Sequence, residues 1–544
     1  MQRTSAALQW LRTVRPWPLL LVLAAVQVAL AIWFSFGTPH NGWVWYSGGD
    51  STEYWTEQWA IGHLTIPQAV IGPGLPIYYA WVPLVAGPTL LQGLPVIVLF
   101  QAIVLVPLAL IFFWLVADRL FGRVYAWACA LLWIAGPFLL IHGFTRNYRP
   151  AFEQNFLVPH WFGFTNMADL PSLVAVLAAA WLLLRAVDGR SPTDAALAGL
   201  AWGLALLFKP SNGFFAIPVI VLIAVTRQWR QAAYFAAALV PALLALFLWK
   251  LRGLGTVPIT SSSYQHVRLA TGMDPVLAVG TSKYGGFDWN HLQQELIQLR
   301  EYFWSLRFLE FLLFAGSFGV IRRWPSRGLF VVSWFAAYGL IKGSNSEANF
   351  DTTSWFRLSE PGLPAYILLT VGVFFCLPVL GRGAARAVAP VAARLERRRI
   401  AIAGALVGVI PLLLMVVAQP ASSMRVVRDN NAVNEAPLSD AFHLKAKVVG
   451  KNVLLTWDAP KHNSTTPLYK IYYSDRDQGC EKPSAGANEC QLNMDRFDAV
   501  ATTHTTVPHR NHPYWYRVGM VANYKLSSGS GDLMLFSSRA VRVP

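Results

Sequence analysis

The chain has 544 residues and a formal net charge of +16, from 44 Lys and Arg residues and 28 Asp and Glu residues. Apolar residues make up 55% of it and charged residues only 13%, about half the roughly 25% of an ordinary globular protein. Disorder is excluded, because a disordered chain needs low hydrophobicity and high charge. The same composition argues against a soluble enzyme of this size and indicates a membrane protein.

Apolar stretches near the ~20 residues that a membrane-spanning helix needs recur through the first 425 residues. The first stretch is too long for a cleaved signal peptide, and aromatic residues stand where a cleavage site would be. The shortest stretches are candidates for tilted, broken or re-entrant segments. The pattern predicts a polytopic α-helical membrane protein with about eleven transmembrane helices, near residues 17–36, 94–116, 124–144, 170–187, 195–208, 212–226, 232–249, 306–321, 328–342, 362–380 and 400–418.

The positions of the basic residues predict the orientation of these spans. With a cytoplasmic N-terminus, the inner segments carry 18 basic and 4 acidic residues, and the outer membrane loops carry 13 basic and 14 acidic residues. Nearly all of the net charge is therefore a topology signal, so we expect contacts with membrane lipids and no nucleic-acid partner. An odd number of spans places the C-terminal domain outside. We expect a multi-pass protein of a bacterial inner (cytoplasmic) membrane with a periplasmic tail.

The composition changes near Asn430, beyond which charged residues are about twice as frequent. We expect residues 1–425 to form the transmembrane domain and residues 426–434 a linker. Residues 435–544 contain short alternating apolar segments between turns, which predicts a C-terminal all-β sandwich. Its function is open between a structural or docking module and a domain that contacts the carbohydrate or acceptor.

Segments of this tail resemble the fibronectin type III family. In that resemblance Trp457 stands at the buried tryptophan of an early strand, and Tyr514 at the corner tyrosine of a late strand. Cys480 and Cys490 are ten residues apart and are predicted to form a disulfide, which persists only in an oxidising compartment. The insertion that carries these cysteines departs from the common pattern of the family.

Polar residues are concentrated in the predicted outer loops, which favours chemistry at the outer membrane–water boundary over transport through the spans. The first outer loop contains GGDSTEY, in which two glycines allow a tight turn before Asp50. A carboxylate near an apolar boundary can act as a base toward a sugar hydroxyl. Asp50 is therefore a candidate base, followed by Glu53 and the candidate sugar-contacting residue Tyr54. The alternative is that Asp50 only caps the next helix.

Basic and aromatic residues of later outer segments are candidate ligands of a lipid phosphate and its sugar. The planar fork of arginine matches phosphate geometry, and a lysine between apolar runs is costly unless it reaches water or an anion. The plainer alternatives are interfacial anchoring, a snorkelling lysine and, for Asp169, simply the start of a helix. The candidates are Arg146, Arg149, His160, Trp161 and Asp169 in the loop 145–171, Lys209 after the fifth span, Tyr284 in a glycine-rich loop, and Arg357 before the tenth span.

Motifs of several other enzyme classes are absent from the sequence. There is no P-loop, no HExxH motif and no nucleophile elbow. The outer histidines lack the spacing of metal ligands. ATP-driven transport and zinc-dependent hydrolysis are therefore unsupported.

Four motifs occur in a fixed order: GGDSTEY after the first span, NMADLPS at 166–172, GLAWGLALLFKPSNGFFAIP at 199–218, and FRLSEPGLPAY at 356–366. Together they resemble the glycosyltransferase C (GT-C) superfamily, which includes protein O-mannosyltransferases, lipid A aminoarabinose transferases and mycobacterial arabinofuranosyltransferases. The resemblance covers about residues 1–380. It implies the GT-C fold and a membrane-embedded, inverting transferase that moves a sugar from a polyprenyl-phosphate-linked donor to a glycan, glycolipid or protein acceptor.

The same resemblance assigns roles to individual residues. It implies Asp50 as the general base and places Arg146, Lys209 and Arg357 at the lipid phosphate. The chain has GGD where other members have paired acids, so the partner of the base is open between the two candidates Glu53 and Asp169.

The resemblance does not demand a cofactor. A divalent cation is an alternative, with Asp50 and Asp169 as its ligands. Two other functions remain as hypotheses: a flippase or transporter of lipid-linked sugar, and a non-catalytic membrane scaffold with an adhesion-like tail. The sequence does not distinguish a pentose from a hexose.

Overall fold

The structure is a computed structural model, and it divides into two compact units that are described separately. The first unit comprises Met1–Ser47, Val98–Leu244 and Gly280–Leu412, and the second comprises Gly48–Ile97, Ala245–Val279 and Leu413–Pro544. The structure describes residues 10–11, 13–36, 50–66, 72–87, 90–139, 163–254, 287–302, 306–345, 348, 354–377, 409–420, 440–459, 468–474, 497–500, 502–509, 513–525, 532–538 and 541–544.

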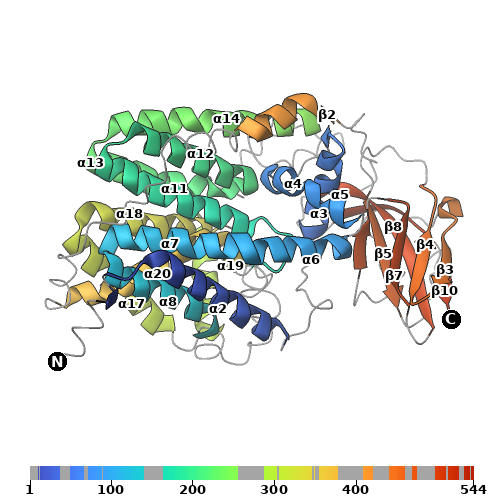
Figure 1. Ribbon diagram of the computed structural model, residues 1–544, viewed down its shortest axis with the longest axis horizontal. Helices are drawn as coiled ribbons and strands as arrows, with labels where there is room; N and C mark the ends of the chain where they lie inside the picture. Colours follow the sequence, from blue (N-terminus) through green and yellow to red (C-terminus); the bar gives the residue numbers. More distant parts are fainter. Residues whose placement is uncertain are drawn as a thin grey trace. The chain divides into compact units, whose positions relative to one another are not determined.

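The first unit is helical (Figure 1). Helices α6 (Leu90–Phe100) and α14 (Trp229–Leu254) have residues in both units. The remaining helical elements of the first unit are α2 (Pro16–Phe36), η1 (Gln101–Leu105), α7 (Val106–Phe121), α8 (Arg123–Leu139), α11 (Asp169–Gly189), α12 (Pro192–Phe208), η3 (Pro210–Phe215), α13 (Ala216–Thr226), α16 (Trp289–Tyr302), α17 (Leu306–Arg323), α18 (Pro325–Phe335), η4 (Ala336–Lys342), α19 (Ser354–Ser359), η5 (Glu360–Gly362), α20 (Leu363–Gly372) and η6 (Val373–Cys376).

The predicted fold class, a mostly helical membrane protein with a C-terminal β region, is confirmed. Among the described residues, five helical segments are long and apolar enough to cross a membrane: Pro16–Trp33, Gly93–Phe121, Asp169–Gly189, Trp229–Trp249 and Trp355–Cys376. Four shorter apolar segments accompany them: Gly74–Ala86, Arg123–Leu139, Pro192–Phe208 and Pro210–Thr226. The total of about eleven spans stays a prediction.

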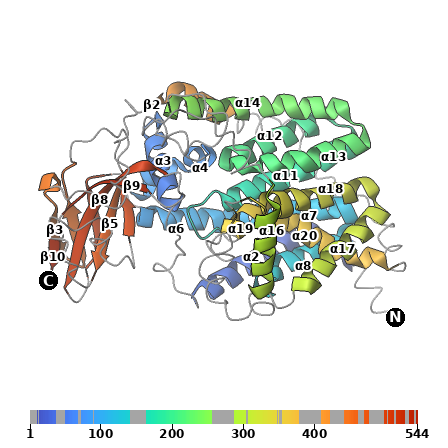
Figure 2. The same ribbon diagram turned by 180° about the vertical axis from the view of Figure 1, so that it is seen from behind.

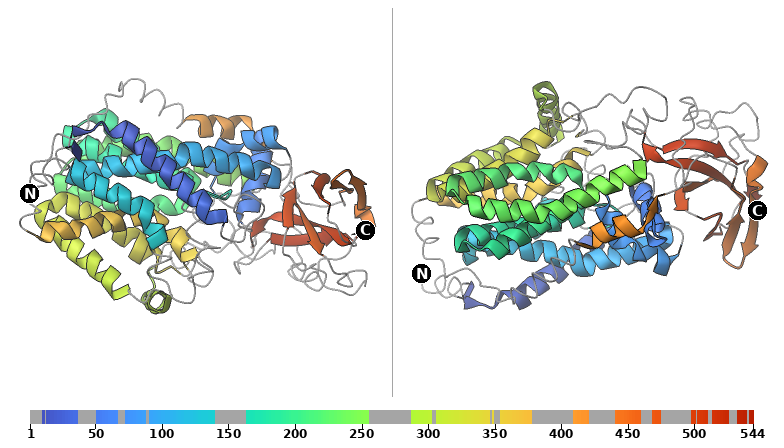
Figure 3. Two further views of the ribbon diagram at one scale, coloured as in Figure 1. Left: turned by 60° about the horizontal axis from the view of Figure 1, so that its bottom comes forward. Right: turned by 90° about the horizontal axis from the view of Figure 1, so that it is seen from above.

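Helix α11 is the central helix of the first unit, and nearly all of it is buried. It packs against α12 on one side and α7 on another, and α2 lies along α7 (Figures 2 and 3). The 21 residues of α11 span roughly 30 Å at ~1.5 Å per residue, close to the thickness of the hydrocarbon core. The two ends of α11 therefore lie where the two membrane faces are expected.

An ionic network joins three helices at the C-terminal end of α11. Asp188 accepts hydrogen bonds from Arg119 of α7, at 2.7 Å, and from Arg327 of α18, at 3.1 Å. Arg327 also donates to the carbonyl of Arg119, at 2.8 Å. All three residues come from segments predicted to be cytoplasmic, so the structure brings residues assigned to one membrane face together at one end of the unit.

Small residues allow close packing between α12 and α14. The Cα of Gly199 faces the carbonyl oxygen of Phe235, and a Cβ added there would collide with that backbone atom. A Cβ at Gly203 would lie 2.7 Å from the Cβ of Ala242. Helices in lipid gain little from apolar burial alone, so a close approach at small residues is the expected means of association.

We expect Gly199→Ala to lower the stability of the unit, because overpacking against backbone typically costs about 1–3 kcal/mol. Gly189→Ala is the matched control, since a Cβ there would meet nothing within 4 Å. Thermal unfolding of the full chain in detergent measures both variants. Equal midpoints for the two variants would show that the α12–α14 contact does not depend on Gly199.

The second unit contains a helical part and the β region. Its helical part consists of α3 (Asp50–Gly62), α4 (Gly74–Tyr79), α5 (Trp81–Ala86) and the start of α6. Gly93 of α6 lies directly against the ring of Trp55 from α3, where no side chain would fit. Strands β1 (Thr65–Ile66) and β2 (Gln419–Pro420) pair in parallel and join the segment after α3 to the chain that enters the tail.

The strands of the tail that the structure describes form two antiparallel sheets. One sheet has the order β3-β4-β7, and the other has the order β10-β8-β5-β6 with β9 paired to β8. A short helical turn, η8 (Asp440–Phe442), precedes them. The strands are β3 (Lys445–Val449), β4 (Asn452–Thr456), β5 (Leu468–Ser474), β6 (Phe497–Val500), β7 (His504–Pro508), β8 (Tyr514–Lys525), β9 (Asp532–Ser537) and β10 (Val541–Val543).

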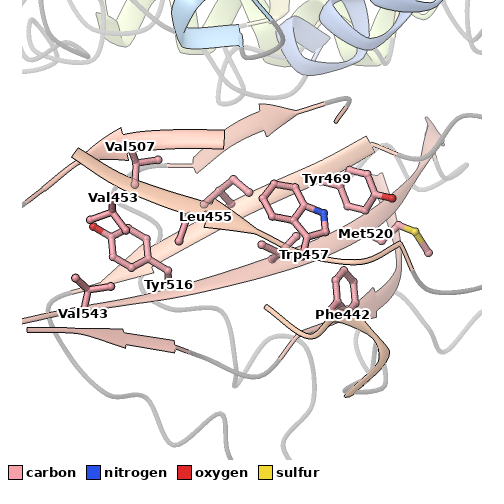
Figure 4. Close-up of a cluster of buried hydrophobic side chains, with 11 residues drawn as sticks. Phe442, Val453, Leu455, Trp457, Tyr469, Val507, Tyr516, Met520 and Val543 are labelled. Carbon is pink, nitrogen blue, oxygen red and sulfur yellow. The ribbon is translucent and has the colours of Figure 1, made fainter. Parts of the chain in front are cut away.

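Side chains from both sheets form one apolar core (Figure 4). Trp457 lies in it and is buried, as its predicted position requires, with its ring edge-on to Tyr469 at 5.5 Å between centroids. Tyr514 is partly buried and packs against the same core. The fibronectin type III likeness stays a prediction, and Cys480 and Cys490 lie outside the described residues.

Candidate active site

The site is built around Asp169, the first residue of α11. Ala168 precedes it as the N-cap, so the carboxylate lies in the first helical turn, where the helix dipole favours a negative charge. The Asp169 side chain is only 2% exposed. The hydroxyl of Ser172 donates to its main-chain carbonyl, at 2.9 Å. The prediction that Asp169 starts a helix is confirmed, and its burial adds the need for a charged partner.

Lys209 supplies that partner from the end of α12. Pro210 follows and begins the 3₁₀ helix η3, and the backbone of Lys209 is extended, with φ −147° and ψ 101°. A proline cannot continue the hydrogen bonding of α12, so the chain turns at Lys209. The Lys209 Nζ lies 2.5 Å from Asp169 Oδ1, and its side chain is 13% exposed. The lysine therefore does not snorkel to water but forms an ion pair inside the unit.

Arg357 of α19 completes a three-residue cluster. Its Nε lies 3.7 Å from Asp169 Oδ2, and its carbonyl oxygen accepts a hydrogen bond from Lys209 Nζ, at 2.9 Å. Asp169 therefore bridges two cations that are 148 residues apart in sequence. The Arg357 side chain is 23% exposed, the most accessible of the three.

Asn212 fixes the turn that carries Lys209. Its side chain is completely buried and donates to the carbonyl of Ala205, at 2.9 Å, while Trp202 donates to the Asn212 carbonyl, also at 2.9 Å. The hydroxyl of Tyr338, from η4, donates to Asn212 Oδ1, at 3.1 Å. One buried amide thus links α12, η3 and η4 behind the charged cluster.

The segment after Arg357 is held by one contact to α18 and one to η4. The indole of Trp334 donates to the carbonyl of Pro361, at 2.7 Å. Gly362 lies so close to Tyr338 that an added Cβ would be 2.8 Å from the Tyr338 Cβ. These contacts fix the position of the short 3₁₀ turn η5, which begins at Glu360.

Glu360 is the fourth charged residue of the site, and it is not among the candidate residues named from the sequence. It is 3% exposed and interacts electrostatically with Asp169, Lys209 and Arg357. The available signal was its place in the motif FRLSEPGLPAY, because an acid at the edge of an apolar span is energetically costly and its presence there indicates a function. We call these four residues the charged cluster.

The charged cluster contains two acids and two bases, so its formal charges balance. Balance matters here because an uncompensated charge in an apolar interior is far more costly than a paired one. Among the described residues, no group of three or more His, Cys, Asp or Glu residues could hold a metal ion. The positive charges of Lys209 and Arg357 also disfavour a divalent cation between Asp169 and Glu360.

The other predicted site residues are distributed differently. Asp50 begins α3 in the second unit, and the side chains of Asp50 and Glu53 lie outside the described part of the chain. Tyr54 is on the same helix and is buried, with 6% exposure. The residues that lie wholly outside the described ranges are Arg146, Arg149, His160, Trp161 and Tyr284.

Comparisons with known proteins bear on this arrangement. Residues 152–250, which include Asp169 and Lys209, match the family described as dolichyl-phosphate-mannose-protein mannosyltransferase. The Archaeoglobus fulgidus oligosaccharyltransferase, crystallised with a disulfide-tethered acceptor peptide containing an NVT sequon, is similar at 16% identity and a TM-score of 0.40. That likeness covers 76% of this chain and 56% of the other, so this chain spans just over half of that protein's length. The comparison with curated proteins gave no match.

The helices and the charged cluster define a polytopic membrane protein with a buried ionic site at one end of α11. The family match contains NMADLPS at 166–172 and GLAWGLALLFKPSNGFFAIP at 199–218, two of the four motifs. These are two of the motifs on which the resemblance to the GT-C superfamily rests.

We expect Lys209→Met to lower the free energy of unfolding by about 3–5 kcal/mol, because it leaves Asp169 buried without its nearest cation. In the double variant with Asp169→Leu, the loss should be well below the sum of the two single losses. Chemical unfolding of the full chain in detergent measures this cycle.

The control cycle combines Lys209→Met with Asp194→Leu. Asp194 has its own partner, Arg185, at 3.1 Å, so these two effects should add. If the cycle with Asp169 were also additive, the ion pair would contribute nothing to folding.

Proposed function

We propose that the chain is a membrane-embedded glycosyltransferase. It moves a sugar from a polyprenyl-phosphate donor to an envelope glycan, lipid or protein acceptor on the outer face, with inversion at the anomeric carbon. The observation that carries the proposal is the convergence of Lys209 and Arg357 on the N-terminal end of α11. Both were expected to be phosphate ligands from separate motifs, and they share one carboxylate.

The geometry suits a lipid phosphate at the edge of the cluster. Arg357 and Lys209 retain partial exposure while Asp169 is fully buried, so an incoming anion meets the cations first. The N-terminal end of α11 adds a favourable field for negative charge. The phosphate shares the two cations with Asp169, and Asp169 holds their side chains in place before the lipid arrives.

The matched family supports the class of donor. Its description names dolichyl phosphate mannose, which is a sugar linked to a polyprenyl phosphate. Two of the residues that we place at the phosphate and its supporting carboxylate, Lys209 and Asp169, lie inside the matched segment. The identity of the sugar in this chain's donor is a separate question.

The proposed reaction is a single displacement. The acceptor hydroxyl gives its proton to the Asp50 carboxylate, and its oxygen forms the new bond to the anomeric carbon. The bond between that carbon and the phosphate oxygen breaks, and its electron pair leaves with the polyprenyl phosphate. Arg357 and Lys209 stabilise the charge that grows on the departing phosphate.

We propose the same orientation that the loop charges predict. The network around Asp188 then lies at the cytoplasmic face and the charged cluster at the outer face, one α11 length away. The β sandwich is proposed to be periplasmic, where it would hold or measure the acceptor.

Asp50→Asn should reduce sugar transfer by about 10²–10⁴-fold, because the amide cannot accept the proton. Binding of the lipid donor should remain. Asp288→Asn is the control, since Asp288 is an exposed residue that caps α16 and asparagine caps a helix equally well. Transfer is measured with reconstituted protein and radiolabelled polyprenyl-phosphate sugars.

Full activity of Asp50→Asn would remove Asp50 as the base. Movement of the lipid-linked sugar across vesicles without any transfer would instead favour a flippase.

Arg357→Gln should weaken binding of polyprenyl phosphate about 10–100-fold, the equivalent of a charged hydrogen bond of about 1.5–3 kcal/mol. Arg300→Gln is the matched control, because Arg300 pairs with Glu310 at 3.1 Å and lies apart from the charged cluster. Binding to detergent-solubilised protein can be followed by scintillation proximity. Unchanged affinity in Arg357→Gln would contradict the phosphate site.

A further inference from the structure

Glu360 has an unusual environment for a carboxylate. Both of its side-chain oxygens are buried, and neither has a hydrogen-bond partner among the residues that the structure describes. Polar groups buried in this way are normally paired, and an exception calls for an explanation such as a bound ligand. The charged cluster therefore contains an acceptor whose donor is not supplied by the described chain.

The neighbouring cations do not fill this role. Lys209 directs its Nζ to Asp169 Oδ1 and to the Arg357 carbonyl, and Arg357 places its Nε toward Asp169 Oδ2. They influence Glu360 electrostatically without bonding to it. They leave its two oxygens free to accept hydrogen bonds from another molecule.

The chemistry of the cluster limits what that molecule can be. A phosphate carries only acceptor oxygens and would be repelled by Glu360. An isoprenoid chain has no donor at all. A divalent cation is disfavoured by the two basic side chains. Among the groups of a lipid-linked sugar, the sugar hydroxyls are the hydrogen-bond donors that suit a carboxylate beside a bound phosphate.

We propose that Glu360 binds a hydroxyl group of the sugar carried by the lipid donor. This inference rests on the proposed function, because it assumes that the lipid phosphate occupies Arg357 and Lys209. The cations then hold the carrier, and Glu360 distinguishes a carrier with its sugar from one without it. Glu360 is thus a specificity residue, three positions beyond Arg357 on the same short segment.

The position of Glu360 suits this task. Glu360 is the first residue of η5. The two residues that follow it are held in place, because Pro361 accepts a hydrogen bond from Trp334 and Gly362 packs against Tyr338. A carboxylate held in advance needs little reordering when the sugar arrives, which favours selective binding. A site that hydrogen-bonds a substrate hydroxyl also rejects an analogue that lacks it.

The test compares two variants of the full chain, Glu360→Gln and Glu360→Leu, with the wild type. The probes are dolichyl phosphate without sugar and a panel of polyprenyl phosphates that carry mannose, arabinofuranose or aminoarabinose. We expect the wild type to bind at least one sugar-bearing lipid about tenfold more tightly than dolichyl phosphate, as one charged hydrogen bond would provide. Glu360→Leu should lose this preference and bind dolichyl phosphate at least as tightly as the wild type, because the carboxylate that repels the phosphate is gone.

Glu360→Gln keeps the shape of the side chain and serves if Glu360→Leu does not fold. It should lose part of the preference, since one acceptor oxygen remains. Arg357→Gln is the contrasting variant, which should weaken the sugar-free and sugar-bearing lipids to the same degree.

Three results would overturn the inference: a wild type without any preference for sugar, a preference retained in both Glu360 variants, or an equal loss for both kinds of lipid. The last would mark Glu360 as a structural residue. The proposed function fails separately when the wild type binds a sugar-bearing lipid with the expected preference but transfers no sugar. A wild type that binds none of these lipids would overturn both proposals.

Discussion

The ion pair between Asp169 and Lys209 is the interaction on which the organisation of the helical unit depends. Both charges lie in an apolar interior, where each alone would be strongly unfavourable. Their pairing joins the start of α11 to the end of α12, and the Arg357 carbonyl that Lys209 also contacts adds α19 to the same point. The helix ends can therefore meet in only a narrow range of arrangements.

Helix α11 connects this pair to a second ionic group at its other end. Asp169 stands at the first residue of the helix, and Asp188 stands one residue before its last. Each acid gathers two arginine or lysine side chains, and the helix between them is apolar and nearly all buried. A length of roughly 30 Å separates the two groups along the helix. The core of the protein thus has two chemically similar ends, of which only one is proposed to act on a substrate.

The two ends differ in the kind of buried group that lacks a hydrogen-bond partner among the described residues, which is the donor Nε of Arg119 at the Asp188 end and the two acceptor oxygens of Glu360 at the other. At the Asp188 end, Arg327 bonds to both a carboxylate and a main-chain carbonyl, which is an arrangement suited to holding helices together. At the Asp169 end, Glu360 has two acceptor oxygens without donors in the described chain. A buried acceptor without a partner is costly, and a bound ligand can repay that cost.

The helical segments could be predicted from the sequence, but the contacts between side chains of the charged cluster could not. Apolar runs determine helices in lipid, so the helical segments and the break at Lys209 and Pro210 were predictable. The burial of Trp457 was expected from the fibronectin type III resemblance, and the structure places this residue in the core. The meeting of Lys209 and Arg357 on Asp169 was not, since it depends on how distant helices pack. Glu360 was missed because sequence shows a costly acid but not whether its oxygens have partners. The role of Asp50 stays a prediction.

The central claim is that the cluster of Asp169, Lys209 and Arg357 receives a lipid phosphate. The most direct measurement is an electron cryomicroscopy structure of the full chain in lipid nanodiscs with polyprenyl phosphate bound. The claim predicts phosphate density within hydrogen-bonding distance of Arg357 and Lys209, beside the first turn of α11. Phosphate density elsewhere, with the two cations still occupied by Asp169 alone, would contradict it.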